Sequence, residues 1–481
     1  MSRLRNSVPE MKEWTSDVVI GLEVHVELNT NTKLFCRCPT KGSEVPNTRT
    51  CEVCLGMPGS KPVLNEKAVE FALRLCLALN CSISNELIFS RKSYFYPDLA
   101  KNYQITQYEQ PLGKNGKLML SNGRLVGITR IHLEEDPASL VHPSGIRESA
   151  YVLVDYNRSG NPLVEIVTKP EIYSASEARD FMRLIISVLE YLEIFDINNG
   201  IIKADANISI KESDFTRVEV KNITGFKEIE SALLYEIERQ SVEIHKGKKI
   251  ICETRAWDTE RQITHSLRTK ETEEDYGYII DTDLVPIDIT KEMIAELKSK
   301  LPELAQEMVQ RFVREYKIAV DDAEIIAGDK ALAELFEKCS KKILPKLCAR
   351  WIRRELIRVL NFQKKSLREI NLDTNNFVDL LEMIQNNVIT EKTAQRLIEK
   401  LAEEQFNLKV YVKKEGLLMI AEESEIEKLC EEAIRENERA VIDYKNGNEK
   451  AINFVIGNVM KKSMGKAKPD TVKDIVMRMI R

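Results

Sequence analysis

GLEVHVEL, residues 21–28, alternates apolar and polar side chains with a strict period of two. This alternation predicts a β-strand with its apolar side chains on one face and its polar side chains on the other. The polar face carries an acid, an imidazole and a second acid, in the order Glu23, His25 and Glu27. A half-buried strand with solvated glutamates is the structural alternative. The composition of this face favours a row of metal ligands or catalytic groups.

A second strand is predicted from Gly127 to Leu133, and it runs into three consecutive acids at residues 134–136. Three adjacent carboxylates repel one another unless a cation or water compensates their charge. A solvated acidic turn also explains such a run. The alternation places Arg130, His132 and Glu134 on one face. If both strands belong to one sheet, this second polar row would meet the first.

Two further strand-like segments present acids. Asp205 and Asn207 share one side of KADANISI, and Glu219 lies on the charged side of TRVEVKNITGF. Acidic strand faces that recur within one domain predict a curved antiparallel sheet whose concave side holds several divalent ions. Oxygen ligands of this kind suit Mg²⁺ or Mn²⁺. The sequence contains no P-loop, so a bound nucleotide would be held through metals and basic side chains.

Four cysteines follow the first strand as CxC, a loop of twelve residues and CxxC: Cys36, Cys38, Cys51 and Cys54. This spacing predicts a tetrahedral Zn²⁺ site, and a group of reduced thiols without metal is the alternative. The other cysteines lie in apolar segments and are interpreted as buried packing residues: Cys76, Cys81, Cys252, Cys339, Cys348 and Cys430. Because the chain shows neither a signal-peptide core nor a membrane-length apolar run, we expect reduced thiols in the cytoplasm.

Two segments are candidates for binding phosphate or a base. RKSYFYPDLAKNYQITQ, residues 91–107, interleaves basic and aromatic side chains. NRSG, residues 157–160, offers side-chain and backbone donors to an anion. A tyrosine-rich structural loop is the alternative for the first segment, and a tight β-hairpin is the alternative for the second.

Composition changes near residue 290, since all five histidines and twelve of the fifteen prolines precede it. This change predicts an α+β fold: a β-rich catalytic domain over residues 1–288, with a zinc-binding insertion at 34–58, followed by a helical domain over 289–408 and a small helical tail domain over 409–481. Thr290 is predicted to cap a helix, and Ser174 with Glu177 forms a capping box for another. A strand-like break is expected at 408–420.

The net charge is −5, so a nucleic-acid partner would depend on local basic regions. Two such regions occur in the helical half, and solvated basic helices are the alternative interpretation. The candidate contacts to a phosphate backbone are Arg350, Arg353, Arg354, Lys461, Lys462, Lys466 and Lys468.

Long motifs throughout the chain resemble the GatB-type subunits of the glutamyl/aspartyl-tRNA amidotransferases, the GatB/GatE family. They occur in the order of that family: IGLEVHVEL, KLFCRCP, CEVCLGMPG, RKSYFYPDLAKNYQITQ, GITRIHLEED, LVDYNRSGNPLVEIV, KADANISI, VEVKNITGF and NFVIGNVMKKSMGKAKPDTV. The resemblance implies a cradle-shaped catalytic domain similar to that of glutamine synthetase, a helical domain and a tail domain that helps to hold tRNA. It also implies ATP-dependent phosphorylation of the Glu or Asp carried by a misacylated tRNA, followed by displacement of phosphate by ammonia.

The resemblance further implies roles for individual residues. The expected catalytic set is Glu23, His25, Glu134, Glu135, Asp205 and Glu219, with Glu23, His25 and Glu135 as ligands of Mg²⁺, or of Mn²⁺ because imidazole is an uncommon Mg²⁺ ligand. ATP, its phosphates and the acceptor end are expected at Arg91, Lys92, Tyr94, Tyr96, Lys101, Tyr103, Gln104, Arg158, Ser159, Lys221 and Asn222. Zinc would be structural.

The implied partners are an amidase-type glutaminase subunit that supplies ammonia, a small third subunit, and aminoacylated tRNA(Asn), tRNA(Gln) or both; no membrane is expected. Two other classes of protein fit some of the same residues. A zinc-containing RNA-binding adaptor would explain the cysteines and basic helices but not four acidic strand faces. A metal-dependent hydrolase would use His25, Glu23 and Glu134 without a need for ATP.

Overall fold

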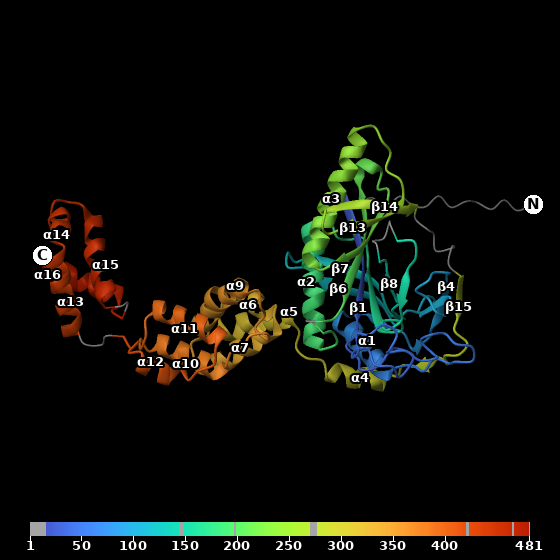
Figure 1. Ribbon diagram of the computed structural model, residues 1–481, viewed down its shortest axis with the longest axis horizontal. Helices are drawn as coiled ribbons and strands as arrows, with labels where there is room; N and C mark the ends of the chain where they lie inside the picture. Colours follow the sequence, from blue (N-terminus) through green and yellow to red (C-terminus); the bar gives the residue numbers. More distant parts are fainter. Residues whose placement is uncertain are drawn as a thin grey trace, which may run out of the picture. The chain divides into compact units, whose positions relative to one another are not determined.

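The GLEVHVEL stretch lies in β1 (Val18–Glu27), inside a nine-stranded sheet (Figure 1). The computed structural model describes residues 16–143, 149–196, 199–269, 277–419, 423–463 and 466–480. The strand order is β14-β13-β12-β11-β1-β10-β7-β6-β2. All neighbours are antiparallel except β12 and β13, which are parallel, so the predicted antiparallel sheet is a mixed one. The α+β class is confirmed.

The remaining strands of the large sheet are short to medium in length. They are β2 (Ser82–Ile83), β6 (Gly113–Met119), β7 (Leu125–Glu135), β10 (Pro162–Thr168), β11 (Ile202–Ile210), β12 (Val218–Thr224), β13 (Glu253–Asp258) and β14 (Ile263–Thr269). Three smaller sheets pair β15 (Gly277–Ile280) with β4 (Ser90–Ser93) and β5 (Tyr103–Thr106), β16 (Ile287–Asp288) with β3 (Glu86–Leu87), and β8 (Ser139–Val141) with β9 (Leu153–Asp155). The predicted strand at 127–133 is thus longer and includes Glu134 and Glu135.

Helices cover one face of the large sheet and bury its apolar side chains. Leu22, Val24 and Val26 of β1 are almost fully buried in this core. The covering helices are α1 (Glu66–Ala78), α2 (Ala175–Leu192) and α3 (Phe226–His245). Because strand side chains alternate between faces, the polar residues of β1 lie on the opposite, helix-free face.

The capping box predicted for α2 is present. Ser174 accepts a hydrogen bond from the backbone N–H of Glu177, and the Glu177 carboxylate accepts one from the N–H of Tyr173. The apolar face of this helix is buried, including Phe181, Ile185 and Leu192. Thr290 likewise caps α4 (Lys291–Ser299) by accepting from the N–H of Met293, as predicted.

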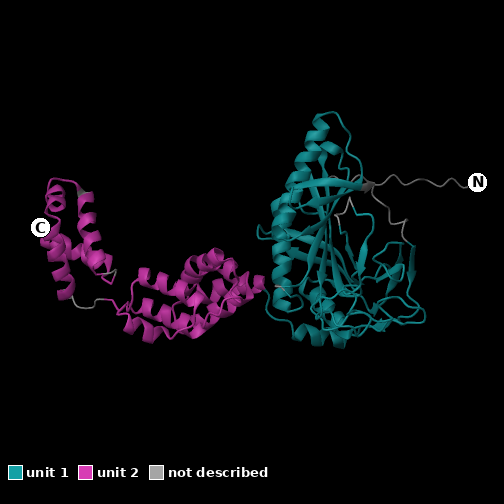
Figure 2. Ribbon diagram, in the orientation of Figure 1, with its two compact units in different colours: residues 1–304 teal, residues 305–481 magenta. Residues whose placement is uncertain are grey.

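The chain divides into two compact units at residue 304, shown in Figure 2. In the first unit, α4 packs on α1, and Leu301 and Leu304 pack on the sheet core. The observed division therefore lies after the predicted boundary at 288, because the first helix beyond that boundary still belongs to the sheet-containing unit.

The second unit is helical in its described part and has two hydrophobic cores, one between Phe312 and Val412 and one between Ile426 and Ile480. Its elements are α5 (Ala305–Arg311), η3 (Phe312–Tyr316), α6 (Val320–Ala327), α7 (Lys330–Ser340), α8 (Pro345–Trp351), η4 (Ile352–Leu356), α9 (Ile357–Gln363), α10 (Thr374–Gln385), α11 (Glu391–Glu403), α12 (Leu408–Lys414), α13 (Glu423–Glu436), α14 (Glu438–Lys445), η5 (Glu449–Ala451), α15 (Ile452–Lys462) and α16 (Pro469–Ile480). Across the described residues, no helix is both long and apolar enough to cross a membrane.

The strand-like break predicted at 408–420 is wrong for its first half, and its last residue lies outside the described residues. Residues 408–414 form α12, capped by Asn407, whose side chain accepts from the N–H of Val410. Leu408 and Val412, four residues apart, are buried, whereas Val410 is 62% exposed. Val410 and Val412 alternate as residues of a strand would, but the buried residues Leu408 and Val412 have the four-residue spacing of a helix. The predicted tail boundary at 409 therefore falls inside a helix that packs on the preceding core.

We expect Ser174→Ala to lower the free energy of unfolding by about 1 kcal/mol, because the N–H of Glu177 loses its acceptor. Ser174→Asp keeps an acceptor and should stay close to wild type. Urea unfolding of both variants measures the difference, and equal losses in the two would contradict a capping role.

Candidate functional site

Imidazoles and carboxylates meet in a row across the middle of the large sheet. His25 of β1 lies opposite Glu165 of β10, and Glu165 lies opposite His132 of β7. The Nε2 atom of His25 is 3.6 Å from a Glu165 oxygen and 3.5 Å from a Glu134 oxygen. The Nε2 atom of His132 is 3.2 Å from the same Glu165 oxygen. The predicted meeting of the two polar rows occurs, with β10 inserted between them.

The row continues on the other side of β1. Glu23 lies opposite Asp205 of β11, and Asn207 donates to the Glu23 carboxylate at 2.9 Å. The ammonium group of Lys221 on β12 is 3.2 Å from an Asp205 oxygen and 3.7 Å from a Glu219 oxygen. All four predicted acidic strands therefore contribute to one polar face.

This polar face lines a cavity of about 940 Å³. Of the residues predicted for catalysis or binding, the cavity is lined by Glu23, His25, Lys92, Tyr94, Gln104, Glu134, Arg158, Asp205, Glu219, Lys221 and Asn222. The two segments 91–107 and 157–160 thus supply part of its wall. The volume is sufficient for a small-molecule ligand such as a nucleotide.

Six predicted residues do not line this cavity: Arg91, Tyr96, Lys101, Tyr103, Glu135 and Ser159. The Glu135 carboxylate accepts from the Lys101 ammonium at 2.6 Å and from the N–H of Ile105 at 2.8 Å. Arg91 donates to Asp281 and Asp283 at 2.8 and 2.9 Å. The charges of Glu135, Lys101 and Arg91 are therefore compensated within the protein.

Glu165 is the main site residue that sequence reasoning missed. It is the one charged residue in the apolar run PLVEIVT of β10, and it is 8% exposed. Such a run predicts a buried strand. A carboxylate buried without a partner costs free energy, so a single acid in this run could have indicated a functional residue. Asp98, Tyr108, Lys203, Thr254 and Tyr278 also line the cavity and were not predicted.

Burial and neighbouring charges shift the pKa values of several side chains at this site. Burial raises the pKa of both Glu23 and Glu134, and the charge of Glu165 adds to both shifts. Burial opposes charge on His25, but its hydrogen bond to Glu165 and the nearby carboxylates raise its pKa to about 10. Burial also opposes charge on Glu165, yet the charge of His132 and hydrogen bonds from both imidazoles hold its pKa well below the usual value. The carboxylates therefore need positive charge, from protons or from a bound cation.

One set of side chains at this site fits a metal ion. One ligand atom each from His25, Glu134 and Glu165 lies within 4.8 Å of the other two. A nitrogen and two carboxylates provide hard donors with room for water or a phosphate oxygen. The structure brings Glu134, rather than its neighbour Glu135, to His25.

The four predicted zinc ligands converge. The sulfur atoms of Cys36, Cys38, Cys51 and Cys54 all lie within 4.8 Å of one another. Tetrahedral Zn–S bonds of about 2.3 Å place sulfurs about 3.8 Å apart, and the Cys51 and Cys54 sulfurs are 3.9 Å apart. The hydrogen bond from Cys36 lowers the pKa of the Cys54 thiol to about 5, with the buried Lys33 acting in the same direction. The cluster fits a structural Zn²⁺ ion.

The turn at 157–160 anchors this cysteine segment. The Asn157 side chain accepts from the N–H of Arg49 and donates to the carbonyl of Val45. The Ser159 hydroxyl donates to the carbonyl of Cys54 at 3.4 Å. The flanking strands β9 and β10 belong to different sheets, so the hairpin alternative is wrong.

Arg158 contacts its own chain as well as the cavity. Its guanidinium donates to the carbonyls of Pro137 and Ala138, both at 3.0 Å, and lies 3.3 Å from an Asp136 oxygen. Burial raises the pKa of Asp136 to about 7, although the Arg158 charge opposes the shift. Arg158 thus holds the end of β7 in addition to lining the cavity.

Most of the remaining cysteines are packing residues, as predicted. Cys76, Cys339, Cys348 and Cys430 are buried and Cys81 is partly buried. Cys252 contradicts the prediction, because it is exposed and lines the cavity. Cys252 directly precedes β13, whose side chains alternate between the cavity and α3. Its apolar neighbours Ile250 and Ile251 had suggested a packing role.

In the second unit, three of the seven predicted basic residues, Arg350, Arg353 and Arg354, line a separate cavity of about 790 Å³ together with Lys317 and Lys346. Arg350 and Arg353 form ion pairs with Glu391 and Asp322, at 2.8 and 2.7 Å. The predicted tail lysines lie on and after α15, where Lys462 pairs with Glu432 and Glu436.

Two family models match the chain: the GatB/GatE catalytic domain over residues 18–295 and the GatB domain over residues 334–480. The chain belongs to the GatB/GatE family. The B subunit of the aspartyl/glutamyl-tRNA(Asn/Gln) amidotransferase of Carboxydothermus hydrogenoformans is 42% identical over 97% of this chain and 98% of its own length. The subunits of the same name from Thermodesulfovibrio yellowstonii and Saccharolobus solfataricus are 42% and 43% identical, over 97% and 96% of this chain and 99% of their own lengths. These matches confirm the resemblance.

We expect Cys51→Ser combined with Cys54→Ser to release zinc and lower the unfolding temperature, because two of the four thiolates are lost. Elemental analysis of the purified protein measures bound zinc. Cys252→Ser, which changes a cysteine outside the cluster, is the matched control and should keep the metal. Zinc retained at wild-type level in the double variant would defeat the assignment.

Proposed function

We propose that this chain activates and transamidates the misacylated Asp-tRNA(Asn), Glu-tRNA(Gln) or both, forming Asn-tRNA(Asn) or Gln-tRNA(Gln). ATP phosphorylates the side-chain carboxylate of the esterified amino acid, and ammonia then displaces phosphate. The observation that carries the proposal is the row of carboxylates and imidazoles from β12 to β7 in one cavity. Family membership supports the same function.

Phosphoryl transfer depends mainly on positioning and charge compensation. His25, Glu134 and Glu165 are proposed to hold one divalent cation, and Glu23, Asp205 and Glu219 form a second acidic group beside it. A bound Mg²⁺ or Mn²⁺ ion would neutralise charge on the transferred phosphoryl group. Glu135 is not part of this proposed set, since its carboxylate is engaged by Lys101 and Ile105.

Basic and polar side chains of the cavity wall are proposed to bind ATP and the acceptor end. Lys92, Tyr94 and Gln104 come from one wall, and Lys221 and Asn222 come from β12. Carboxylates raise the pKa of Lys221 although burial opposes its charge, so it stays protonated. It can thus hold Asp205 and Glu219 in place and offer positive charge to a phosphate.

Ammonia must be supplied from outside this chain in the proposed reaction. An amidase-type glutaminase subunit would produce it, and a small third subunit would hold the two large subunits together. The four clustered cysteines fit zinc rather than glutaminase chemistry. The reaction is therefore proposed to run in a cytoplasmic heterotrimer.

The helical parts are proposed to hold tRNA. Arg350, Arg353 and Arg354 line one basic cavity, and Lys461, Lys462, Lys466 and Lys468 belong to the tail. Such side chains bind phosphates without reading sequence. The sheet-containing unit is proposed to be a cradle similar to the catalytic domain of glutamine synthetase.

The direct test uses the chain co-purified with its amidase partner, with MgATP, ammonium chloride in place of glutamine, and either Asp-tRNA(Asn) or Glu-tRNA(Gln). We expect amidation of at least one aminoacyl-tRNA together with release of ADP. Binding of both tRNAs without amidation or ADP release would contradict the proposal and favour an adaptor role.

Adjacent glutamates provide a matched pair of variants. Glu134→Gln should lower the amidation rate about 10²- to 10³-fold with little change in unfolding temperature, because it removes charge at the proposed metal ligands. Glu135→Gln should instead lower the unfolding temperature, because it leaves the partly buried Lys101 ammonium without its counter-charge. Amidation by the Glu134→Gln enzyme at the wild-type rate would remove Glu134 from the site.

A further inference from the structure

Thr254 of β13 contacts the polar face at Glu219, on the neighbouring strand β12. It lies opposite Glu219 in the parallel pairing of β12 and β13, and its hydroxyl donates to the Glu219 Oε2 atom at 2.8 Å. Thr254 is 2% exposed and lines the cavity. The other Glu219 oxygen faces the Lys221 ammonium at 3.7 Å. Each carboxylate oxygen of Glu219 thus has a defined neighbour.

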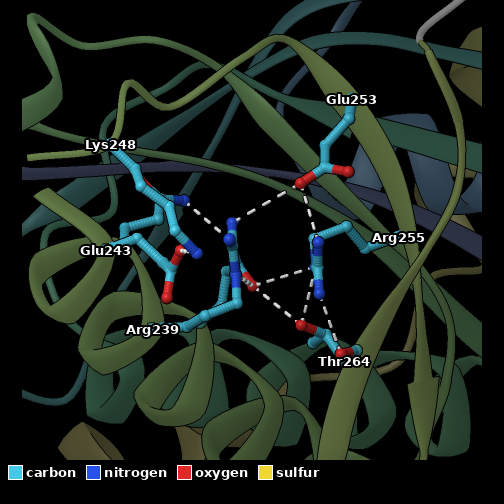
Figure 3. A network of polar contacts seen from close by, with 8 residues as sticks. Arg239, Glu243, Lys248, Glu253, Arg255 and Thr264 are labelled. Atoms are coloured by element: carbon cyan, nitrogen blue, oxygen red, sulfur yellow. Dashed lines mark hydrogen bonds and ion pairs between the residues drawn. The ribbon is translucent and has the colours of Figure 1, made fainter. Parts of the chain in front are cut away.

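The residues on either side of Thr254 face away from the cavity. Because side chains alternate along a strand, Glu253 and Arg255 project toward α3 while Thr254 projects toward Glu219. The Arg255 Nη1 group donates to Glu253 at 2.7 Å, and its Nε and Nη2 groups donate to the hydroxyl and carbonyl of Thr264 on β14, at 2.8 and 2.9 Å (Figure 3). The arginine therefore connects the backbones of β13 and β14.

This arginine is connected in turn to α3 through Glu236, which has no exposed surface. The Glu236 carboxylate accepts hydrogen bonds from Arg239, Gln240 and Thr264, at 2.6 to 2.9 Å. Arg239 also lies 3.7 Å from Glu253, and a dashed line in Figure 3 marks this ion pair. The network holds two strands and one helix in a fixed mutual arrangement.

Burying such charges is expensive, and apolar packing would stabilise the helix–strand contact at lower cost. A network of directed hydrogen bonds, however, restricts the position of a strand more tightly than apolar contact does. β13 is next to the edge strand, and its pairing to β12 is the one parallel pairing among the described strands of this sheet. Parallel pairing is slightly weaker per residue. The location of the network fits a role in fixing β13.

We propose that Thr254 is a positioning residue for Glu219, and that the α3 network holds β13 so that the Thr254 hydroxyl orients the Glu219 carboxylate into the cavity. The inference rests on the proposed function, which gives Glu219 its role in phosphoryl transfer. Thr254 itself acts through Glu219 and contacts no reacting atom.

The test compares Thr254→Val, which removes the hydroxyl at nearly constant volume, with Thr254→Ser, which keeps it. In the complex with the amidase partner, we expect the valine variant to lower kcat for ammonium-dependent amidation by about 10- to 100-fold, with KM for aminoacyl-tRNA unchanged. Because Glu219 belongs to the acidic group beside the proposed cation, the valine variant should also weaken Mn²⁺ binding, measured by electron paramagnetic resonance on the enzyme without substrates. The serine variant should restore both. Loss of both properties in the serine variant would overturn the proposal.

A double variant separates positioning from general damage. If Thr254 acts through Glu219, then Thr254→Val should have no further effect in a Glu219→Gln background, whereas independent effects multiply. Two outcomes would overturn the positioning role alone. In the first, the losses of amidation rate in the two single variants multiply in the double variant. In the second, the Thr254→Val enzyme has the wild-type rate while the Glu219→Gln enzyme is inactive. A fully active Glu219→Gln enzyme would instead overturn the proposed catalytic role of Glu219, and the inference with it.

Discussion

Carboxylates that repel one another on one face of the large sheet determine which charges must surround them. Glu23, Glu134, Glu165, Asp205 and Glu219 all line one cavity, and all are buried except Glu23, which is partly buried. Such a group is stable only when positive charge lies among its members. The protonated His25 imidazole and the Lys221 ammonium supply part of that charge, at 3.2 to 3.7 Å from the carboxylates. A divalent cation bound to His25, Glu134 and Glu165 would replace the imidazole proton and bring more positive charge.

Surrounding elements keep these side chains in place, and some of them also form part of the cavity wall. On one face, helices α1 to α3 bury the apolar half of every central strand. At the end of β10, the cysteine cluster and the turn at 157–160 hold each other through Asn157 and Ser159. Beyond β12, the buried charges around Glu236 hold β13. Rigid support of this kind is what phosphoryl transfer by charge compensation requires.

Local patterns predicted eleven of the residues that line the cavity. Strict alternation identified β1, β7, β11 and β12 and the side chains that each presents, and cysteine spacing identified the metal cluster. The strand order was not predictable, because pairing depends on contacts distant in sequence. For that reason Glu165, in a strand that reads as apolar, was missed. Alternation placed Glu134 on the same face as His132, and the expectation of Glu135 as a metal ligand came from the family resemblance and not from the strand pattern. The local sequence around Arg91 also did not show that its guanidinium is paired within the protein, because Asp281 and Asp283 lie far along the chain.

The most direct test of the central claim is to locate a bound metal ion. Crystals of the enzyme grown with Mn²⁺ and a non-hydrolysable ATP analogue would show the ion by anomalous diffraction. We predict an ion about 2.1 Å from donor atoms of His25, Glu134 and Glu165. An ion coordinated by Glu135 instead, or a nucleotide-bound cavity with no ion at the His25 group, would contradict the account.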